Sequence, residues 1–219
     1  MNTVLILAAG DQRRWSEDAP KQLVNVGGEL LIRRTVRQVK ARGGDPVVVT
    51  HHPLIMAAAI DVARIYLPQY RRWLLETLYQ TRPLWDGQMV ALLGDVCFSG
   101  AAMDMILKET RPGIRLYGTA EEIFALRFTP ADDVSLYVPY ADAGAQTAEV
   151  DVGRMWNLYR SLSGLPLRKR VVPLRDGDPV FAYVDDWTRD FDLPNQYEVF
   201  KVMVLDAELL DDLPEATHV

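Results

Sequence analysis

Three cationic side chains follow closely on the first apolar segment of the chain. The segment from Gly10 to Lys21 reads G-D-Q-R-R-W-S-E-D-A-P-K, and its cations are Arg13, Arg14 and Lys21. A glycine lets backbone approach a ligand closely, and guanidinium and ammonium groups bind phosphate oxygens. The loop therefore predicts a phosphate-binding site, and three cations suit a triphosphate. It lacks the Gly-Lys-Ser/Thr ending of a Walker loop and the later glycines of a dinucleotide fingerprint, which disfavours kinases and dehydrogenases.

The segments on either side of this loop indicate the strands and the helix that hold it in place. Residues 3–8 form a nearly continuous apolar run, typical of a buried parallel strand. Residues 30–42 repeat apolar side chains at helical spacing, and Gly43-Gly44 ends that helix. A second apolar strand at 47–50 completes a βαβ unit. Ligands of such sheets bind beyond the carboxyl ends of the strands, which is where the cationic loop falls.

Further along the chain, strands and helices continue to alternate. Pro53, Pro68 and Pro83 interrupt a helical pattern between residues 52 and 85, which favours two short helices and a loop. Strands are expected at 89–93, 114–117, 123–128 and 180–184, and helices at 101–108, 152–162 and 194–205. With no internal repeat or clear linker, this order predicts an α/β, Rossmann-like fold of one domain, residues 1–219, with a mostly parallel sheet flanked by helices.

Composition limits the partners of the protein. Its 219 residues are 49% hydrophobic and carry a net charge of -6, so broad electrostatic binding to nucleic acid or to an anionic membrane is not expected. No apolar run approaches the roughly 18 residues of a membrane-spanning helix. The only cysteine, Cys97, cannot form an intrachain disulfide, and no signal-peptide pattern opens the sequence. We therefore expect a cytoplasmic protein in which any anionic ligand is bound by a local group of side chains and not by a broadly charged surface.

Several motifs in order along the chain resemble one family of enzymes. The run Leu7-Ala8-Ala9-Gly10, then Arg14, then the P-K-Q-L of residues 20–23 resemble the signature of the nucleotidyltransferases that include sugar-1-phosphate and molybdopterin nucleotidylyltransferases. The resemblance continues through G-G-E-L-L at 27–31, G-D-V at 94–96 and D-F-D-L-P at 190–194. The family pattern has a glycine where this chain has Gln12 and a small residue where it has Arg13, so the backbone contacts to the phosphates are expected to differ.

The resemblance implies a GT-A-like fold and assigns residues to the nucleotide. The nucleotide-binding residues would be Leu7, Ala8, Ala9, Gly10, Arg13, Arg14 and Lys21. It also implies that Asp95, after a central strand, and Asp192, before a late helix, jointly hold a divalent cation, with Asp190 as a candidate helper. Mg²⁺ prefers hard oxygen ligands and commonly takes one or two carboxylates together with substrate phosphates, which agrees with this assignment. Leu193 replaces a family threonine, a change that removes a helix cap rather than a ligand.

The chemistry implied by this family is attack of an acceptor phosphate on the α-phosphorus of a nucleoside triphosphate, with release of pyrophosphate. A phosphate monoester has a second pKa of about 6, so the nucleophile is already charged and needs little base catalysis. Catalysis then consists of positioning and charge neutralisation, for which Arg14, Lys21 and Asp95 are the candidate catalytic residues. The acceptor, expected to be a sugar phosphate or similar small molecule, would bind to the region from about 101 to 178, with Glu122 as a candidate contact.

Two other functions and some purely structural roles stay open at this point. Asp190 and Asp192 form an Asp-x-Asp pair of the kind with which many glycosyltransferases hold the metal of a nucleotide sugar. The replacement of a glycine by Gln12 also permits a nucleotide-binding domain without catalysis. Arg13 could be a solvated loop residue, and Asp95 and Asp192 could simply cap the helices that follow them.

Overall fold

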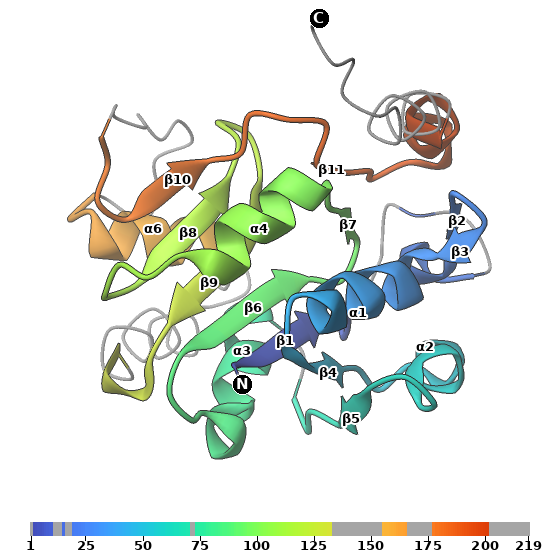
Figure 1. The fold of residues 1–219 in the computed structure, drawn as a ribbon, viewed down its shortest axis with the longest axis horizontal. Helices are drawn as coiled ribbons and strands as arrows, with labels where there is room; N and C mark the ends of the chain where they lie inside the picture. The colour runs from blue at the N-terminus through green and yellow to red at the C-terminus, as the bar shows by residue number, and fades with distance from the viewer. Residues whose placement is uncertain are drawn as a thin grey trace, which may run out of the picture.

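The computed structural model describes residues 2–10, 15, 19–70, 73–132, 155–165 and 177–201. A seven-stranded sheet forms the centre of this structure (Figure 1). The strand order is β10-β8-β9-β6-β1-β4-β5. The strands are β1 (Thr3–Leu7), β4 (Asp45–Val49), β5 (Arg64–Tyr66), β6 (Met89–Leu93), β8 (Arg115–Gly118), β9 (Ile123–Phe128) and β10 (Phe181–Tyr183).

The directions of these strands confirm the mostly parallel sheet that the sequence predicts. β1 pairs in parallel with both β4 and β6, β4 with β5, and β8 with β10. β9 is antiparallel to both of its neighbours, β6 and β8. The carboxyl ends of the other six strands therefore meet at one edge of the sheet, and the turn from β8 to β9 lies at that same edge.

Helices cover both faces of the sheet (Figure 1). Successive side chains of a strand point to opposite faces. Leu5 and Leu7 of β1 pack in one apolar cluster with α3 (Leu74–Gln80) and α6 (Met155–Leu162). Val4 and Ile6 pack on the other face, against α1 (Leu31–Ala41), α2 (Pro53–Ala59) and α4 (Gly100–Lys108). Both faces being buried explains why β1 is a continuous apolar run.

Two small two-stranded sheets accompany the main one. β2 (Asn25–Val26) pairs with β3 (Glu29–Leu30), and β7 (Val96–Cys97) pairs with β11 (Arg189–Asp190), both antiparallel. The described residues also include the short 3-10 helices η1 (Lys21–Leu23), η2 (Arg82–Leu84) and η3 (Pro130–Asp132). A further helix occupies residues 194–201.

The prediction for residues 52–85 was incomplete. The two short helices are present as α2 and α3, but β5 lies between them and adds an edge strand to the sheet. The two-residue strands β7 and β11 were also not predicted. None of the helices in the described ranges is both long and apolar enough to cross a membrane.

Candidate functional site

The start of the cationic loop is fixed at the carboxyl end of β1. The amide of Ala8 donates to the carbonyl of Val49 at 2.9 Å, and the hydroxyl of Thr50 donates to the carbonyl of Ala8 at 2.9 Å. Leu7, Ala8 and Ala9 are buried, whereas Gly10 is exposed. Apart from Gly10 and its chain neighbours, no heavy atom of the described residues lies within 4 Å of the place where a Cβ of Gly10 would stand, so this backbone leaves room for a ligand.

Gly94 brings the end of β6 against the end of β1. Its amide donates to the carbonyl of Leu7 at 2.9 Å. A Cβ at Gly94 would lie 2.9 Å from that carbonyl oxygen and 3.0 Å from the Cβ of Ala8, closer than side-chain carbons normally approach. Only glycine fits this contact without a shift of the backbone. The contact places Asp95, the next residue, beside the first loop.

Lys21 links the first loop to three carboxylates. It begins η1, and its side chain is only 6% exposed. Its ammonium nitrogen lies 3.1 Å from Asp95 Oδ2, 3.0 Å from Asp190 Oδ1 and 3.7 Å from Asp192 Oδ1. The structure therefore brings together three predicted site residues, Lys21, Asp95 and Asp192, and the candidate helper Asp190. We call these four residues the lysine-aspartate cluster.

The β7–β11 ribbon delivers Asp190 to the cluster. Asp190 pairs with Val96, the residue after Asp95. The approach to β11 is held by Asp186, which accepts from the hydroxyl of Ser99 at 2.5 Å and from the amide of Thr188 at 2.7 Å. The same Ser99 hydroxyl accepts from the amide of Ala102 at 2.8 Å and so caps α4. One serine thus connects the start of α4 to the strand that carries Asp190.

The residues after β11 are anchored by an aromatic side chain. Phe191 is buried, with ring centroids 5.3 Å from Tyr197 and 5.7 Å from Phe200. Phe191 stands between Asp190 and Asp192 in the chain, and its buried ring anchors the segment from which both aspartates reach Lys21. The helix at 194–201 is capped by Gln196, whose side-chain oxygen accepts from the amides of Asp192 at 2.8 Å and Leu193 at 3.1 Å. Gln196 thus satisfies the amides just before the helix, which is the half of a capping box that a side chain in the first turn provides.

Burial and charge perturb the groups of the cluster. Burial, followed by the negative charge of Asp95, raises the pKa of Asp190 to about 7, although Lys21 acts in the opposite direction. Burial alone would lower the pKa of Lys21, but the charges and hydrogen bonds of Asp95 and Asp190 together raise it above its ordinary value. Lys21 is therefore a cation at neutral pH, and it offsets the repulsion among the carboxylates.

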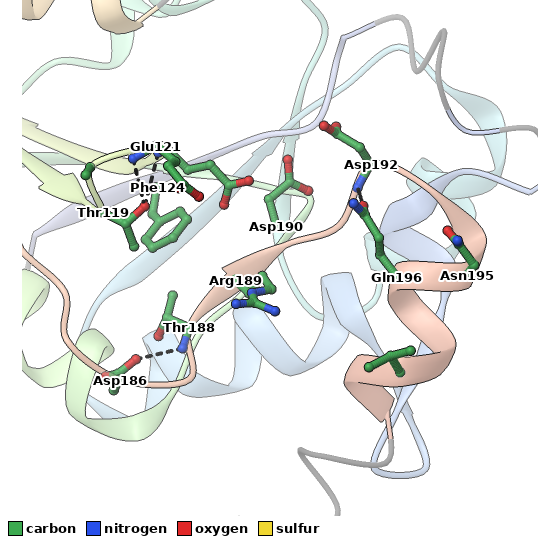
Figure 2. A pocket seen from close by; sticks show the side chains of 13 residues that line it. Thr119, Glu121, Phe124, Asp186, Thr188, Arg189, Asp190, Asp192, Asn195 and Gln196 are labelled. Atoms are coloured by element: carbon green, nitrogen blue, oxygen red, sulfur yellow. Dashed lines mark hydrogen bonds between the residues drawn. The ribbon is translucent and has the colours of Figure 1, made fainter. Parts of the chain in front are cut away.

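A pocket of about 620 Å³ opens beside Asp190 and Asp192 (Figure 2). Figure 2 shows Thr119 and Glu121 on one side of it and Asn195 and Gln196 on the other. Its lining consists mainly of polar and charged residues: Thr119, Ala120, Glu121, Glu122, Phe124, Asp186, Thr188, Arg189, Asp190, Asp192, Asn195, Gln196 and Val199. A lining of this kind suits a hydrophilic molecule that carries several hydrogen-bonding groups.

Glu122, the predicted acceptor contact, lines this pocket. It ends the turn from β8 to β9, where Thr119 accepts through its hydroxyl from the amides of Glu121 at 3.2 Å and Glu122 at 3.1 Å. A Cβ at Gly118 would lie only 2.0 Å from the carbonyl oxygen of Glu122, so this turn requires a glycine. Burial is the main cause that raises the pKa of Glu122. The turn thus holds a partly buried carboxyl at the pocket wall.

Some site residues lie beyond the described ranges, and others were missed in the sequence. Gln12, Arg13 and Arg14 belong to the ranges that the structure does not describe. Arg189 and Asn195 line the pocket but carry no sequence signal that distinguishes them from surface residues. Asp190 was not missed, because it was expected from the sequence as a candidate helper, and it forms an Asp-x-Asp pair with Asp192.

The donor atoms of the cluster are suited to a hard cation. Asp95, Asp190 and Asp192 provide carboxylate oxygens, which Mg²⁺ prefers, and their oxygens already surround one positive charge, the ammonium of Lys21. Within the described part of the chain, no three histidine, cysteine, aspartate or glutamate side chains are grouped as the ligands of one ion. The donor atoms of the three carboxylates suit a divalent cation, but their oxygens are arranged around the ammonium of Lys21.

Solved structures of low sequence identity share this fold. A protein described as a glucose-1-phosphate thymidylyltransferase from Bacillus anthracis, in complex with a sucrose, is 12% identical, with a TM-score of 0.64 over 94% of this chain and 96% of that one. The inositol-1-phosphate CTP transferase from T. maritima is 11% identical, with a TM-score of 0.60 over 92% of this chain and 95% of that one. At these identities the similarity shows the fold alone. No curated protein matches the sequence.

The match to a protein family rests on the first half of the chain. Residues 4–113 match the model of the MobA-like NTP transferase domain. This range contains most of β1, together with Gly94 and two of the four residues of the lysine-aspartate cluster, Lys21 and Asp95. The family match agrees with the fold, with the lysine-aspartate cluster and with the resemblance of the sequence motifs. The chain belongs to the family of MobA-like NTP transferase domains.

Proposed function

We propose that this protein transfers a nucleoside monophosphate from a nucleoside triphosphate to a phosphorylated small acceptor, with release of pyrophosphate, in a reaction that depends on a divalent cation. The observation that carries the proposal is the lysine-aspartate cluster. It joins three carboxylates within 3.7 Å of the ammonium of one lysine, at the edge of the sheet where ligands of such sheets bind, and a polar pocket of about 620 Å³ lies beside it.

The first loop would hold the triphosphate. The open backbone at Gly10 allows close approach of the phosphates, and the ammonium of Lys21 would bind their oxygens. Arg13 and Arg14 would add charge-assisted hydrogen bonds, with Arg14 and Lys21 stabilising the charge that develops on the leaving pyrophosphate. Leu7, Ala8 and Ala9 would bind the nucleoside at the end of β1.

Asp95 and Asp192, with Asp190 as a helper, would hold Mg²⁺ or another divalent cation. A divalent cation bound there supplies positive charge to the α-phosphate and to the leaving pyrophosphate. The role of the chain is to present the carboxylates at fixed positions. Gly94 fixes Asp95, and the β7–β11 ribbon fixes Asp190.

The polar pocket would hold the acceptor. Its wall offers Glu122 and Thr119 from the turn and Asn195 from the helix, side chains that hydrogen bond to hydroxyl groups. Both structural neighbours bear names of enzymes for phosphorylated polyols, glucose 1-phosphate and inositol 1-phosphate, which supports a sugar phosphate or polyol phosphate. The acceptor phosphate would then attack the α-phosphorus directly, because it is ionised at neutral pH.

A screen of substrates tests this proposal. The purified protein is mixed with Mg²⁺, one of four nucleoside triphosphates and one of a panel of sugar and polyol phosphates, and pyrophosphate release is measured. We expect release that requires both substrates and the metal. Nucleoside diphosphate release from a nucleotide sugar would favour a glycosyltransferase, and nucleotide binding without turnover would favour a non-catalytic domain. Either result would overturn the proposal.

A further inference from the structure

The ammonium of Lys21 stands at the point where the carboxylates of the cluster converge. It hydrogen bonds to Asp190 at 3.0 Å and lies 3.1 Å from Asp95 and 3.7 Å from Asp192. Its side chain is 6% exposed, while those of the three aspartates are 21–27% exposed. The lysine is thus enclosed by the cluster, and the aspartate oxygens remain reachable from the solvent side.

The proposed reaction places two demands on these residues that conflict in this arrangement. A divalent cation needs carboxylate oxygens within about 2.0–2.1 Å. The same oxygens are occupied by the ammonium, and two positive charges at one position repel each other. The lysine in turn must reach the phosphates of the nucleotide, which it cannot do while it binds all three aspartates.

We propose that Lys21 and a divalent cation compete for the same aspartate oxygens, so that Lys21 occupies the cation position until a triphosphate draws its ammonium away. In the nucleotide-free protein, the lysine neutralises the carboxylates and weakens metal binding. A bound triphosphate offers Lys21 other anionic oxygens, and the aspartates become available to the cation. This inference rests on the proposed function, since the triphosphate and the divalent cation are the ligands proposed there.

The local structure allows this exchange with little backbone movement. The backbone of η1 is held by hydrogen bonds from the amides of Leu23 to Pro20 at 2.8 Å and of Val24 to Lys21 at 3.1 Å. The lysine side chain has four rotatable bonds, so its ammonium can move while η1 stays in place. Without a cation, three carboxylates close together repel one another, and this repulsion increases their affinity for whichever cation is present.

Binding of Mn²⁺ in the absence of nucleotide tests the competition directly. Mn²⁺ titrations followed by electron paramagnetic resonance are performed at neutral pH on the wild type and on Lys21→Met. We expect the variant to bind Mn²⁺ at least tenfold more tightly. Lys40→Met, which removes the same charge from an exposed position on α1, serves as the control and should match the wild type. Adding Asp190→Asn to Lys21→Met should remove the gain.

Unchanged or weaker Mn²⁺ binding by a folded Lys21→Met variant would overturn the inference. If that variant does not fold, Lys21→Gln, which retains a hydrogen-bond donor, is measured in its place. The test is separate from that of the proposed function. Tighter Mn²⁺ binding without any pyrophosphate release would support the competition and count against the enzyme activity, and the reverse combination would do the opposite.

Discussion

Asp190 lies directly opposite Val96 in the β7–β11 ribbon, and Val96 follows Asp95 in the chain. The register of one short antiparallel pair therefore sets the separation of two carboxylates that come from distant parts of the sequence. Lys21 bridges both, at 3.1 Å from Asp95 and 3.0 Å from Asp190. Alterations of the ribbon should consequently affect the site as strongly as alterations of the acids themselves.

Replacing Asp95 by Asn should abolish most turnover while the fold stays intact. The change removes one carboxylate charge from a partly exposed side chain, so it should lower the rate by at least about 100-fold, as loss of a charge-stabilising group commonly does. Pyrophosphate release measures the rate, and thermal unfolding checks the fold. Asp86→Asn, at an exposed loop position, is the control. A near-normal rate for the Asp95 variant would refute its role.

Asp95 and Asp192 should act as a unit rather than independently. If both hold one cation, the double Asn variant should be scarcely slower than the slower single variant. Rates are measured over a range of Mg²⁺ concentrations, and each single variant should need more Mg²⁺ for half-maximal rate. Additive damage at unchanged Mg²⁺ demand would instead indicate separate roles.

Gly94→Ala should destabilise the protein by about 1–3 kcal/mol, the usual cost of forcing atoms into a packed position. The added Cβ would stand 2.9 Å from the carbonyl oxygen of Leu7. Gly100→Ala is the matched control, because its Cβ would be 3.6 Å from the nearest atom, a side-chain nitrogen of Arg42. That control should be neutral or stabilising by up to about 1 kcal/mol. Denaturant unfolding compares the two, and equal effects would contradict the packing argument.

Ser99→Ala should lower both stability and activity. It removes the cap of α4, worth about 1 kcal/mol, and the hydrogen bond that holds Asp186 before β11. Thr188→Val is the comparison, since it removes only the acceptor of the Ser99 amide. Unfolding free energies and pyrophosphate release are measured for both. If Ser99→Ala loses stability but retains the full rate, the ribbon does not depend on this serine for its position.

Glu109 should contribute to stability in a pH-dependent manner. Its carboxylate accepts from the guanidinium and amide of Arg111 and from the amide of Thr110, and the pKa of Glu109 is lowered from 4.5 to about 2, mainly by the Arg111 side chain. A lowered folded-state pKa gives stability that is present above 4.5 and is lost as the pH falls through about 2. The difference in unfolding free energy between wild type and Glu109→Gln should therefore shrink with acidification. A constant difference would show that the charge is not responsible.

The sequence predicts best those parts of the fold whose side chains follow one regular period. β1, β4 and β6 are continuous apolar runs because both faces of the sheet are covered, and α1 shows its buried face at helical spacing. Loops after such strands meet at one edge, which is why the cationic loop and Asp95 could be expected on the same side of the sheet. The pairing of Asp95 with Asp192 was expected from the resemblance to the family and not from the pattern of the strands.

The missed elements have no such local pattern. β5 contains only Arg64, Ile65 and Tyr66, and it is a strand because it pairs with β4. β7 and β11 are two residues each and owe their conformation to pairing across the chain. The contact of Lys21 with the carboxylates likewise could not be predicted from the sequence, because it depends on the direction of the lysine side chain at the carboxyl edge of the folded sheet.

The hydrogen bond from Lys21 to Asp190 spans 169 residues of the sequence. A chain synthesised from its N-terminus exposes Lys21 and Asp95 to the cell long before Asp190 has been made. Contacts between distant residues also form late in folding, because the intervening chain must first be closed into a loop. A nascent or truncated chain that has folded its parallel strands still lacks Asp190 and Asp192 of the lysine-aspartate cluster. The lysine-aspartate cluster is therefore complete only after residue 192 has been synthesised.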